Sequence, residues 1–170
     1  MNLKFTIRNE RPGDMASIAY VTEEAFKTLE ISDHTEQFVV NALRASGVLA
    51  ISLVAEIDSK VIGHIAFSPV NMSDETSDWY GLGPVSVLPG YQRQGIGKAL
   101  IEEGLSQLRG IKAKGCCLVG HPLYYRKFGF ENTTELVFKG VPEEVFFVLS
   151  FDGDIPRGEV TFHDAFNATG

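Results

Sequence analysis

The stretch VLPGYQRQGIGKAL, residues 87–100, contains the residue types and spacing that most clearly indicate chemistry. A strand-like segment of alternating apolar residues ends at the start of this stretch. From Gly95 onward the apolar residues recur at helical spacing. The first N–H groups of a helix have no partner within it and lie at the positive end of its dipole. Gly95 and Gly97 let an anion approach the backbone and allow dihedral angles that other residues avoid. With Arg93 and Lys98 nearby, the turn is predicted to bind a phosphate group.

Two common phosphate-binding motifs do not fit this turn. A Walker A loop has the form Gly-x-x-x-x-Gly-Lys-Ser/Thr, and here Ile96 and Gly97 stand where the lysine and the hydroxyl residue belong. A dinucleotide fingerprint has the form Gly-x-Gly-x-x-Gly, and Leu100 stands in place of its third glycine. The motif that remains is Gln-x-x-Gly-x-Gly between a strand and an amphipathic helix.

Charge is distributed unevenly along the chain. The formal net charge of −7 argues against a nucleic-acid-binding protein, because phosphate backbones require a strongly basic surface. Residues 90–130 nevertheless carry seven basic and two acidic side chains, a local charge of +5, so the rest of the chain sums to −12 (−7 − 5). A basic island in an acidic protein indicates a compact anionic ligand.

Length and composition predict one domain over residues 1–170. A chain of 170 residues, 44% of them hydrophobic, suits a single core. Its first twenty residues lack the apolar core of a signal peptide, and its longest apolar run, residues 48–57, is short of the ~20 residues that span a bilayer. We therefore expect a cytoplasmic protein without membrane contact. Cys116 and Cys117 are neighbours on a strand and point to opposite faces, so no disulfide framework and no metal site is expected.

Periodicity predicts the elements that position the turn. Strands are expected at residues 3–10 (with Leu3, Phe5 and Ile7 on one face), 48–57, 61–70, 79–89, 116–120, 130–138 and 145–151, and helices at 15–26 (after an Asp14 N-cap), 35–46, 95 to about 110, and 122–129. A tight turn joins strands 48–57 and 61–70 into a hairpin. A helix connects strands 79–89 and 116–120, so these two should be parallel, and Gly83-Pro84 should interrupt the pairing of the first.

Together these features resemble the GNAT family of N-acetyltransferases, and most of all its uncharacterised YhbS-like bacterial branch. In that family Gln/Arg-x-x-Gly-x-Gly/Ala holds the pyrophosphate of acetyl-CoA. TIRNERPGDMASIAYVTEEAF resembles the family's first strand and helix, LGPVSVLPGYQRQGIGKALI its cofactor motif, and LYYRKFGF its Tyr-x-x-x-Gly-Phe segment. The resemblance covers about residues 3–135. It implies a mixed α/β GNAT fold, a mostly antiparallel sheet with one parallel, splayed strand pair and flanking helices, to which residues 136–170 add a strand and an extension.

The resemblance also implies how acetyl-CoA is held as cosubstrate. A bulge at Gly83-Pro84 would splay the strand, so that the backbones of Val85, Val87 and Leu88 pair with the pantetheine arm. The N–H group of Val87 would polarise the thioester carbonyl, as in an oxyanion hole. The other expected contacts are Gln92, Arg93, Gln94, Gly95, Ile96, Gly97, Lys98, Tyr124 and Lys127. No metal is expected.

For catalysis, the resemblance implies direct attack of an amine on the thioester. Tyr125, four residues before Gly129, has the position of the family's acid, which protonates the departing thiolate, and Tyr124 is the alternative acid. The candidates for a general base are Glu56, His64, His121, a water molecule, and an acidic group near the expected acceptor site: Glu23, Glu24, Glu30 and Asp33. Gly120-His121-Pro122 departs from the family pattern, in which an asparagine often follows this strand and helps to hold the pantetheine.

The acceptor is expected to be a primary amine of a small molecule or peptide. The acidic first quarter of the chain favours a cationic one. The apolar segment from residue 145 is predicted to be a core strand, with a homodimer interface as the alternative. The alternative function is a non-catalytic acetyl-CoA sensor or partner-binding domain.

Overall fold

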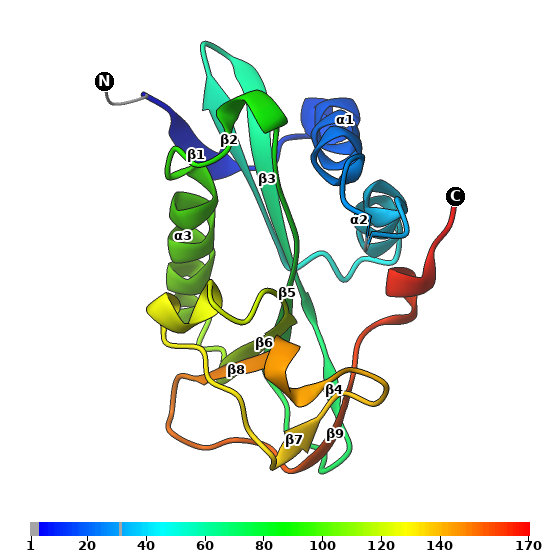
Figure 1. Ribbon diagram of the computed structural model, residues 1–170, viewed down its shortest axis with the longest axis vertical. Coiled ribbons are helices and arrows are strands. Elements are labelled where there is room, and N and C mark those ends of the chain that lie inside the picture. The colour runs from blue at the N-terminus through cyan, green and yellow to red at the C-terminus, as the bar shows by residue number, and fades with distance from the viewer. Residues whose placement is uncertain (1–3, 31) are drawn as a thin grey trace.

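The computed structural model describes residues 4–30 and 32–170, so Leu3 of the first expected strand lies outside the described residues. A central sheet separates two helical layers (Figure 1). Helices α1 (Met15–Phe26) and α2 (Glu36–Ala45) lie on one side of it, and α3 (Ile96–Gly110) lies on the other. The C-terminal segment runs along the side of α1 and α2.

The central sheet has six strands in the order β1-β2-β3-β5-β6-β8. Their bounds are β1 (Thr6–Asn9), β2 (Ile51–Ile57), β3 (Lys60–Pro69), β5 (Trp79–Val87), β6 (Gly115–Val119) and β8 (Phe146–Ser150). Every neighbouring pair is antiparallel except β5 and β6, which are parallel. The expected mixed sheet is confirmed, and residues 146–150 form its edge strand β8, in which Phe146, Phe147 and Val148 are buried.

The connections follow the turn and capping residues, with one exception. Asp58 and Ser59, both with positive φ, turn β2 into β3 as a hairpin. Helix α2 ends at Ala45. Gly47, two residues later, has a φ of 72°, a conformation that suits a residue without a side chain. Asp14 precedes α1 as predicted, but its carboxylate does not cap that helix. It instead accepts hydrogen bonds from the Arg11 N–H (2.6 Å) and the Arg8 guanidinium (2.7 Å).

Strand β5 is broken in its middle. Its parallel pairing with β6 ends at Gly81, opposite Cys117. On the other side, Val85 pairs with Ile65 and Leu82 pairs with Phe67, so β5 has one more residue than β3 between these two pairs. The extra residue is a β-bulge at Gly83-Pro84, where the sequence predicted an interruption. From there on β5 stays paired with β3 and separates from β6.

The predicted strand over residues 130–138 is wrong. Only Glu131 forms an isolated bridge, with Val148 of β8. The Asn132 side chain then donates to the carbonyl groups of Glu143 and Phe146, both at 2.9 Å, which turns the chain away from the sheet. The segment continues in a second sheet, of order β4-β9-β7, which the sequence did not predict. Its strands are β4 (Asn71–Met72), β7 (Leu136–Val137) and β9 (Gly158–Thr161).

The main core includes buried residues from both faces of the sheet, and on the α3 side it depends on two close approaches to the backbone. A side chain at Gly63 would meet Ile96 and Leu100 of α3, and one at Gly104 would overlap the Phe67 ring. Cys116 belongs to this core and Cys117 to the core beneath the second sheet. The two side chains therefore point to opposite faces of their strand, as expected. In the described part of the chain, no helix combines the length and apolar character needed to span a membrane.

Replacement of Gly104 by alanine tests the packing of α3. The new methyl group would overlap the buried Phe67 ring, and overpacking of this kind costs about 1–3 kcal/mol. We expect a lower free energy of unfolding in urea denaturation. Gly110→Ala is the control, because it lies on the same helix with open space around it, and it should leave stability unchanged or raise it. Equal effects of the two variants would contradict this account of α3 packing.

Candidate active site

A cleft of about 540 Å³ opens where β5 ends and α3 begins. Ten of the predicted cofactor contacts and Tyr125 line it, and they come from two separate stretches of the chain, residues 85–98 and 124–127. The predicted residues that line it are Val85, Val87, Gln92, Arg93, Gly95, Ile96, Gly97, Lys98, Tyr124, Tyr125 and Lys127. Ser86, Tyr91 and Ile101 complete the lining; they lie in or beside the predicted cofactor motif, but no contact was predicted for them.

The two glycines of the turn serve different purposes. Gly95 has a φ of 87°, and nothing lies within 4 Å of where its Cβ would be, so its left-handed conformation is what requires glycine. Gly97 is helical, and a Cβ there would lie 3.6 Å from the Tyr124 hydroxyl, inside the cleft. No side chain caps this end of α3. Its first N–H groups are therefore available to an anion.

The backbone of β5 faces the cleft at alternate residues. The Leu88 N–H donates to the Ile62 carbonyl at 2.9 Å, which makes these two residues a hydrogen-bonded pair between β3 and β5. In an antiparallel ladder such pairs alternate with pairs whose backbone groups point away. Val87 and Val85 thus turn their N–H and C=O groups away from β3, toward the gap beside β6.

Leu88 and Gln94 do not line the cleft, whereas Gln92 does, and all three form hydrogen bonds within the protein. The Leu88 side chain is buried, and its carbonyl accepts from the Tyr91 N–H at 2.8 Å, so both of its backbone groups are bonded within the protein. The Gln92 amide donates to the Val87 carbonyl at 2.9 Å. The Gln94 amide reaches back to the Gly90 carbonyl at 3.5 Å and does not line the cleft.

Three of the seven basic residues between 90 and 130 lie at the cleft: Arg93, Lys98 and Lys127. Arg93 has a φ of 62°, an uncommon conformation for a side-chain-bearing residue, at the turn into α3. Lys98 pairs loosely with Glu102 at 3.8 Å. Arg109 instead lies over the Phe151 ring. The basic island is therefore divided between the cleft and the outer surface of the protein.

Tyr124 and Tyr125 both reach the cleft, in different directions. Their rings are nearly perpendicular, with centroids 5.0 Å apart. The Tyr124 hydroxyl lies beside the first turn of α3, and the Lys127 ammonium sits 4.1 Å above its ring. Tyr125 packs deeper, against the rings of Phe130 and Phe147. It fills the space over Gly120, just beyond the end of β6.

Burial sets the protonation of both phenols. It raises the pKa of Tyr125 to about 12, with a further contribution from Tyr124. The pKa of Tyr124 is also raised, first by burial and then by the charge of Glu102. Both groups therefore hold their protons at neutral pH and can act as proton donors.

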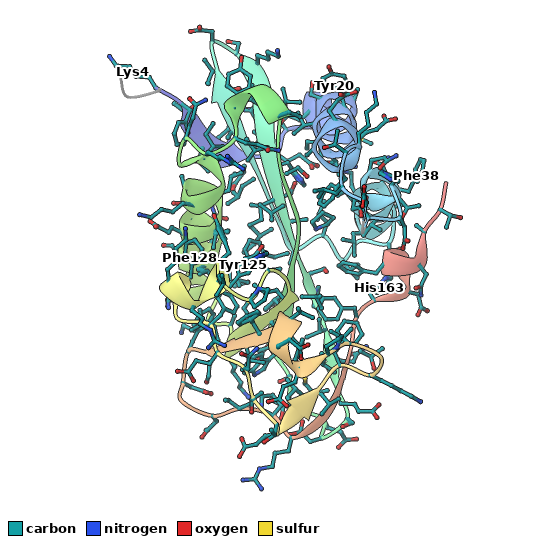
Figure 2. The ribbon with its side chains drawn as sticks, in the orientation of Figure 1. Lys4, Tyr20, Phe38, Tyr125, Phe128 and His163 are labelled. Atoms are coloured by element: carbon teal, nitrogen blue, oxygen red, sulfur yellow. The ribbon has the colours of Figure 1, made fainter. Side chains whose placement is uncertain are left out.

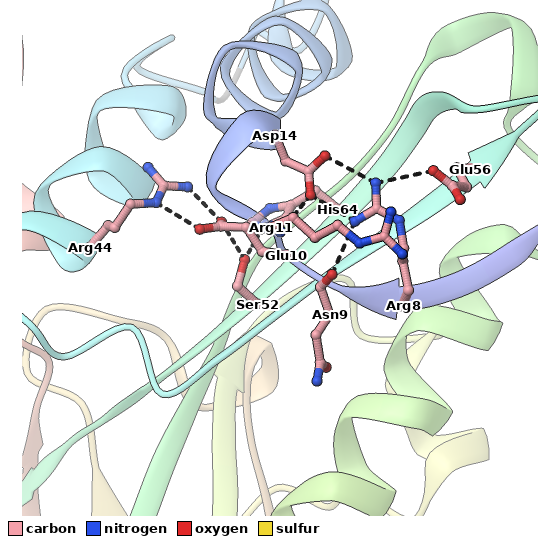
Figure 3. Close-up of polar contacts among 9 residues, drawn as sticks. All are labelled: Arg8, Asn9, Glu10, Arg11, Asp14, Arg44, Ser52, Glu56 and His64. Atoms are coloured by element: carbon pink, nitrogen blue, oxygen red, sulfur yellow. Dashed lines mark hydrogen bonds and ion pairs between the residues drawn. The ribbon is translucent and has the colours of Figure 1, made fainter.

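None of the side-chain candidates for a general base lines the cleft, although Asp33 of the acidic group lines a second cavity described below. Figure 3 shows Glu56 and His64 in a polar cluster between β1, β2, β3 and the two helices above them. Glu56 accepts a hydrogen bond from Arg8 at 3.1 Å. His121 is exposed and its Nδ1 accepts from the Leu123 N–H at 3.1 Å.

His64 terminates a hydrogen-bonded chain that begins on α2. Arg44 donates twice to the Glu10 carboxylate, at 2.6 and 2.9 Å, and that carboxylate accepts from the Ser52 hydroxyl at 2.7 Å (Figure 3). Ser52 has given its only proton to Glu10, so the His64 Nε2, 2.8 Å from the same oxygen, must be the donor of that contact. Nδ1 is then a bare, buried acceptor. Burial lowers the pKa of His64 to about 4. It is therefore a neutral structural histidine at pH 7.

A second cavity, of about 280 Å³, adjoins the same break in β5. Aromatic side chains of the C-terminal segment form much of its wall. Nothing in the sequence pattern singled them out, because they lie in short, irregular elements. Among the described residues, no group of three or more His, Cys, Asp and Glu side chains could hold a metal ion.

Residues 49–132 match the family model of the acetyltransferase (GNAT) domain. YhbS of Escherichia coli K12, an uncharacterized N-acetyltransferase, is 36% identical over 126 residues, which cover 74% of this chain and 72% of YhbS. A GNAT family acetyltransferase from Brucella melitensis, solved with acetyl-CoA, is 50% identical with a TM-score of 0.87, and the match covers 96% of this chain and 98% of that one. E. coli YhbS solved with CoA has 32% identity and a TM-score of 0.88, covering 100% and 96%.

The buried imidazole makes stability depend on pH. Between pH 6.5 and about 4 the unfolded chain binds a proton at His64 and the folded chain does not, so the free energy of unfolding falls as the pH falls through this window. The difference between a pKa of 6.5 in the unfolded chain and about 4 in the folded chain corresponds to about 3 kcal/mol of unfolding free energy.

His64→Gln removes this titration and keeps a donor for Ser52. The plot of unfolding free energy against pH, from urea denaturation between pH 4 and 7.5, should be flatter than for the parent protein. His34→Asn, at an exposed position with positive φ, is the control and should leave the slope unchanged. A parent slope that persists in His64→Gln would show that other groups cause it.

Proposed function

The chain belongs to the GNAT family of N-acetyltransferases, and we propose that it transfers the acetyl group of acetyl-CoA to a primary amine by direct attack. One observation carries the proposal. The open end of α3, the outward-facing backbone of β5 and the two tyrosines line a single cleft. We also propose that residues 1–170 act as one domain, since β8 pairs with β6 and β9 pairs with β4.

The cleft suits coenzyme A in charge and in hydrogen-bonding groups. The first turn of α3, with Arg93 and Lys98, would bind the pyrophosphate. The backbone groups of Val85 and Val87 would pair with the pantetheine amides, and the Val87 N–H would polarise the thioester carbonyl. The Gln92 amide, which bonds the Val87 carbonyl, would have to yield that acceptor to a pantetheine amide. Leu88 supports the strand instead of contacting the cofactor.

The reaction balances without an acyl-enzyme. The amine nitrogen forms a bond to the carbonyl carbon, and the bond from that carbon to sulfur breaks. Tyr125 gives its proton to the thiolate. Water carries the proton released by the nitrogen back to the phenolate, because Glu56, His64 and His121 do not line the cleft. The products are an N-acetylamine and free CoA thiol.

The alternative, a domain that binds acetyl-CoA without transferring it, would need the same cleft but not the two phenols. The position of Tyr125 at the end of β6, protonated and close to the β5–β6 gap, favours catalysis.

A glutamate at position 97 tests the cofactor site. Its side chain would extend from the Gly97 backbone into the cleft beside Tyr124 and place a negative charge where the pyrophosphate is expected. Gly97→Glu should abolish the rise in melting temperature that acetyl-CoA causes in the parent protein. Gly110→Glu, on the same helix in open space, should retain that rise. An unchanged rise in Gly97→Glu would remove the turn from the cofactor site.

Removal of the Tyr125 hydroxyl tests the acid. In Tyr125→Phe, the rate constant for thiol release from acetyl-CoA with a panel of amines should fall about 100-fold, with the KM for acetyl-CoA little changed. Tyr124→Phe is the matched comparison and should have the smaller effect. A larger loss in Tyr124→Phe would exchange the two assignments. If no amine accelerates thiol release although acetyl-CoA raises the melting temperature, the domain is a sensor.

A further inference from the structure

The second cavity meets β5 next to the first. Leu82, Gly83 and Pro84 line it, and Val85, the next residue, lines the cofactor cleft. Val119, at the end of β6, also lines it. The parallel pairing has already ended at this level of the sheet, so the strands leave a gap here. A molecule in the second cavity would therefore lie at the edge of the gap that the cofactor cleft reaches from its other side.

Aromatic rings from the C-terminal part of the chain build one wall. Phe138 and Phe162 are stacked, with centroids 4.9 Å apart and planes within 9° of parallel. Phe166 meets the Phe162 ring edge-on at 5.1 Å. The Phe162 ring also occupies the space over Gly81, where any side chain would displace it. Phe26 from α1 adds a fourth ring. The wall is thus a fixed apolar surface, able to hold a flat or apolar group.

Negative charge lies beside these rings. Asp33, from the segment that joins α1 to α2, and Glu36, the first residue of α2, are both part of the lining. Glu36 is held in place by the Ser32 hydroxyl at 2.7 Å. The described lining residues include no lysine, arginine or histidine. Two carboxylates next to aromatic faces attract a cation, by charge and by the ring quadrupole, and they disfavour an anion.

We propose that this cavity binds the acceptor, and that the acceptor is a small primary amine with an aromatic or similarly apolar body and no carboxylate. The assignment rests on the proposed transferase function, because it names the molecule that the cofactor cleft would acetylate. A volume of about 280 Å³ suits a compact molecule, because it lies just below the roughly 300–1,000 Å³ of ordinary ligand pockets. The ring wall selects the body of the amine, and the two carboxylates select its ammonium group.

In the reaction, the ammonium group first loses a proton to water at the mouth of the cavity. The nitrogen then bonds to the acetyl carbon across the β5–β6 gap, and the carbon–sulfur bond breaks. The nitrogen loses a second proton and the thiolate takes one up, so one ammonium ion and one acetyl-CoA give one acetamide, one CoA thiol and one proton.

Matched acceptors test the class. Thiol release is measured with 2-phenylethylamine, with phenylalanine (the same ring with a carboxylate), with ethylamine (no ring) and with spermidine (several charges and no ring). We expect kcat/KM for 2-phenylethylamine to exceed each of the others by about tenfold or more, since loss of an apolar contact in a pocket costs roughly 10–200-fold. Equal or better use of spermidine or phenylalanine would overturn the assignment.

Variants test the cavity itself. Phe166→Leu and Asp33→Asn should each raise the KM for 2-phenylethylamine about tenfold and leave the KM for acetyl-CoA unchanged. Asp33 is exposed, so this variant keeps the test valid if Phe166→Leu does not fold. The matched controls are Phe151→Leu, whose ring lies under Arg109, and Glu103→Gln on the exposed side of α3, and both should behave as the parent.

Calorimetric titration of 2-phenylethylamine into the CoA-bound protein tests amine binding in the second cavity separately from the transferase function. Binding that Asp33→Asn weakens, without acetylation of any amine, would support the cavity and overturn the transferase function. Acetylation of another amine, with no binding of 2-phenylethylamine, would support the transferase function and overturn the cavity. Neither binding nor acetylation would overturn both.

Discussion

The break in strand β5 is the constraint on which the rest of the structure depends. A regular strand would have bonded to β3 on one side and β6 on the other along its whole length. The extra residue at Gly83-Pro84 lets β5 keep its bonds to β3 while it leaves β6 after Gly81. Backbone groups of Val85 and Val87 are thereby left facing a gap. The cofactor cleft and the second cavity both adjoin that gap.

The two layers of helices use the gap in different ways. On one face, α3 starts directly after β5 and directs its uncapped end into the cofactor cleft. It can pack this closely because Gly63 and Gly104 leave room for side chains of the facing element. On the other face, α1, α2 and the C-terminal segment enclose an apolar cavity with acidic residues at its side. One face thus places basic side chains and an open helix end at its cavity, and the other places Asp33 and Glu36 at its cavity.

Ion pairs and hydrogen bonds fix α1 and α2 on their side of the sheet. Arg8 joins β1 to Asp14 ahead of α1, and Arg44 joins α2 to Glu10. The chain from Glu10 through Ser52 to His64 extends this connection into the centre of the sheet (Figure 3). Two of the residues that looked suited to base catalysis, Glu56 and His64, belong to this support. Figure 2 shows that Tyr125 lies on the opposite side of the sheet from Tyr20 and Phe38 of the two helices.

Local patterns were sufficient to predict the parts of the fold that are encoded by neighbouring residues. The helix periods, the hairpin turn, the parallel strand pair and the Gly-x-Gly turn into α3 are all properties of short segments, and the structure contains each of them. The break in β5 was likewise readable, because Gly83-Pro84 cannot continue a regular central strand.

Tertiary structure alone decided which side chains meet. The segment 130–138 was predicted to be a strand of the central sheet, but Asn132 bonds to carbonyl groups of residues 143 and 146, and the chain continues into a second sheet. His64 was a candidate base in the sequence, but in the structure it is fully buried and its Nε2 is hydrogen-bonded to the Ser52 hydroxyl. Phe138, Phe162 and Phe166 form one wall although they come from separate irregular segments. Periodicity describes how a residue faces its own element, whereas burial and contact depend on which distant element packs against it, and no local pattern contains that information.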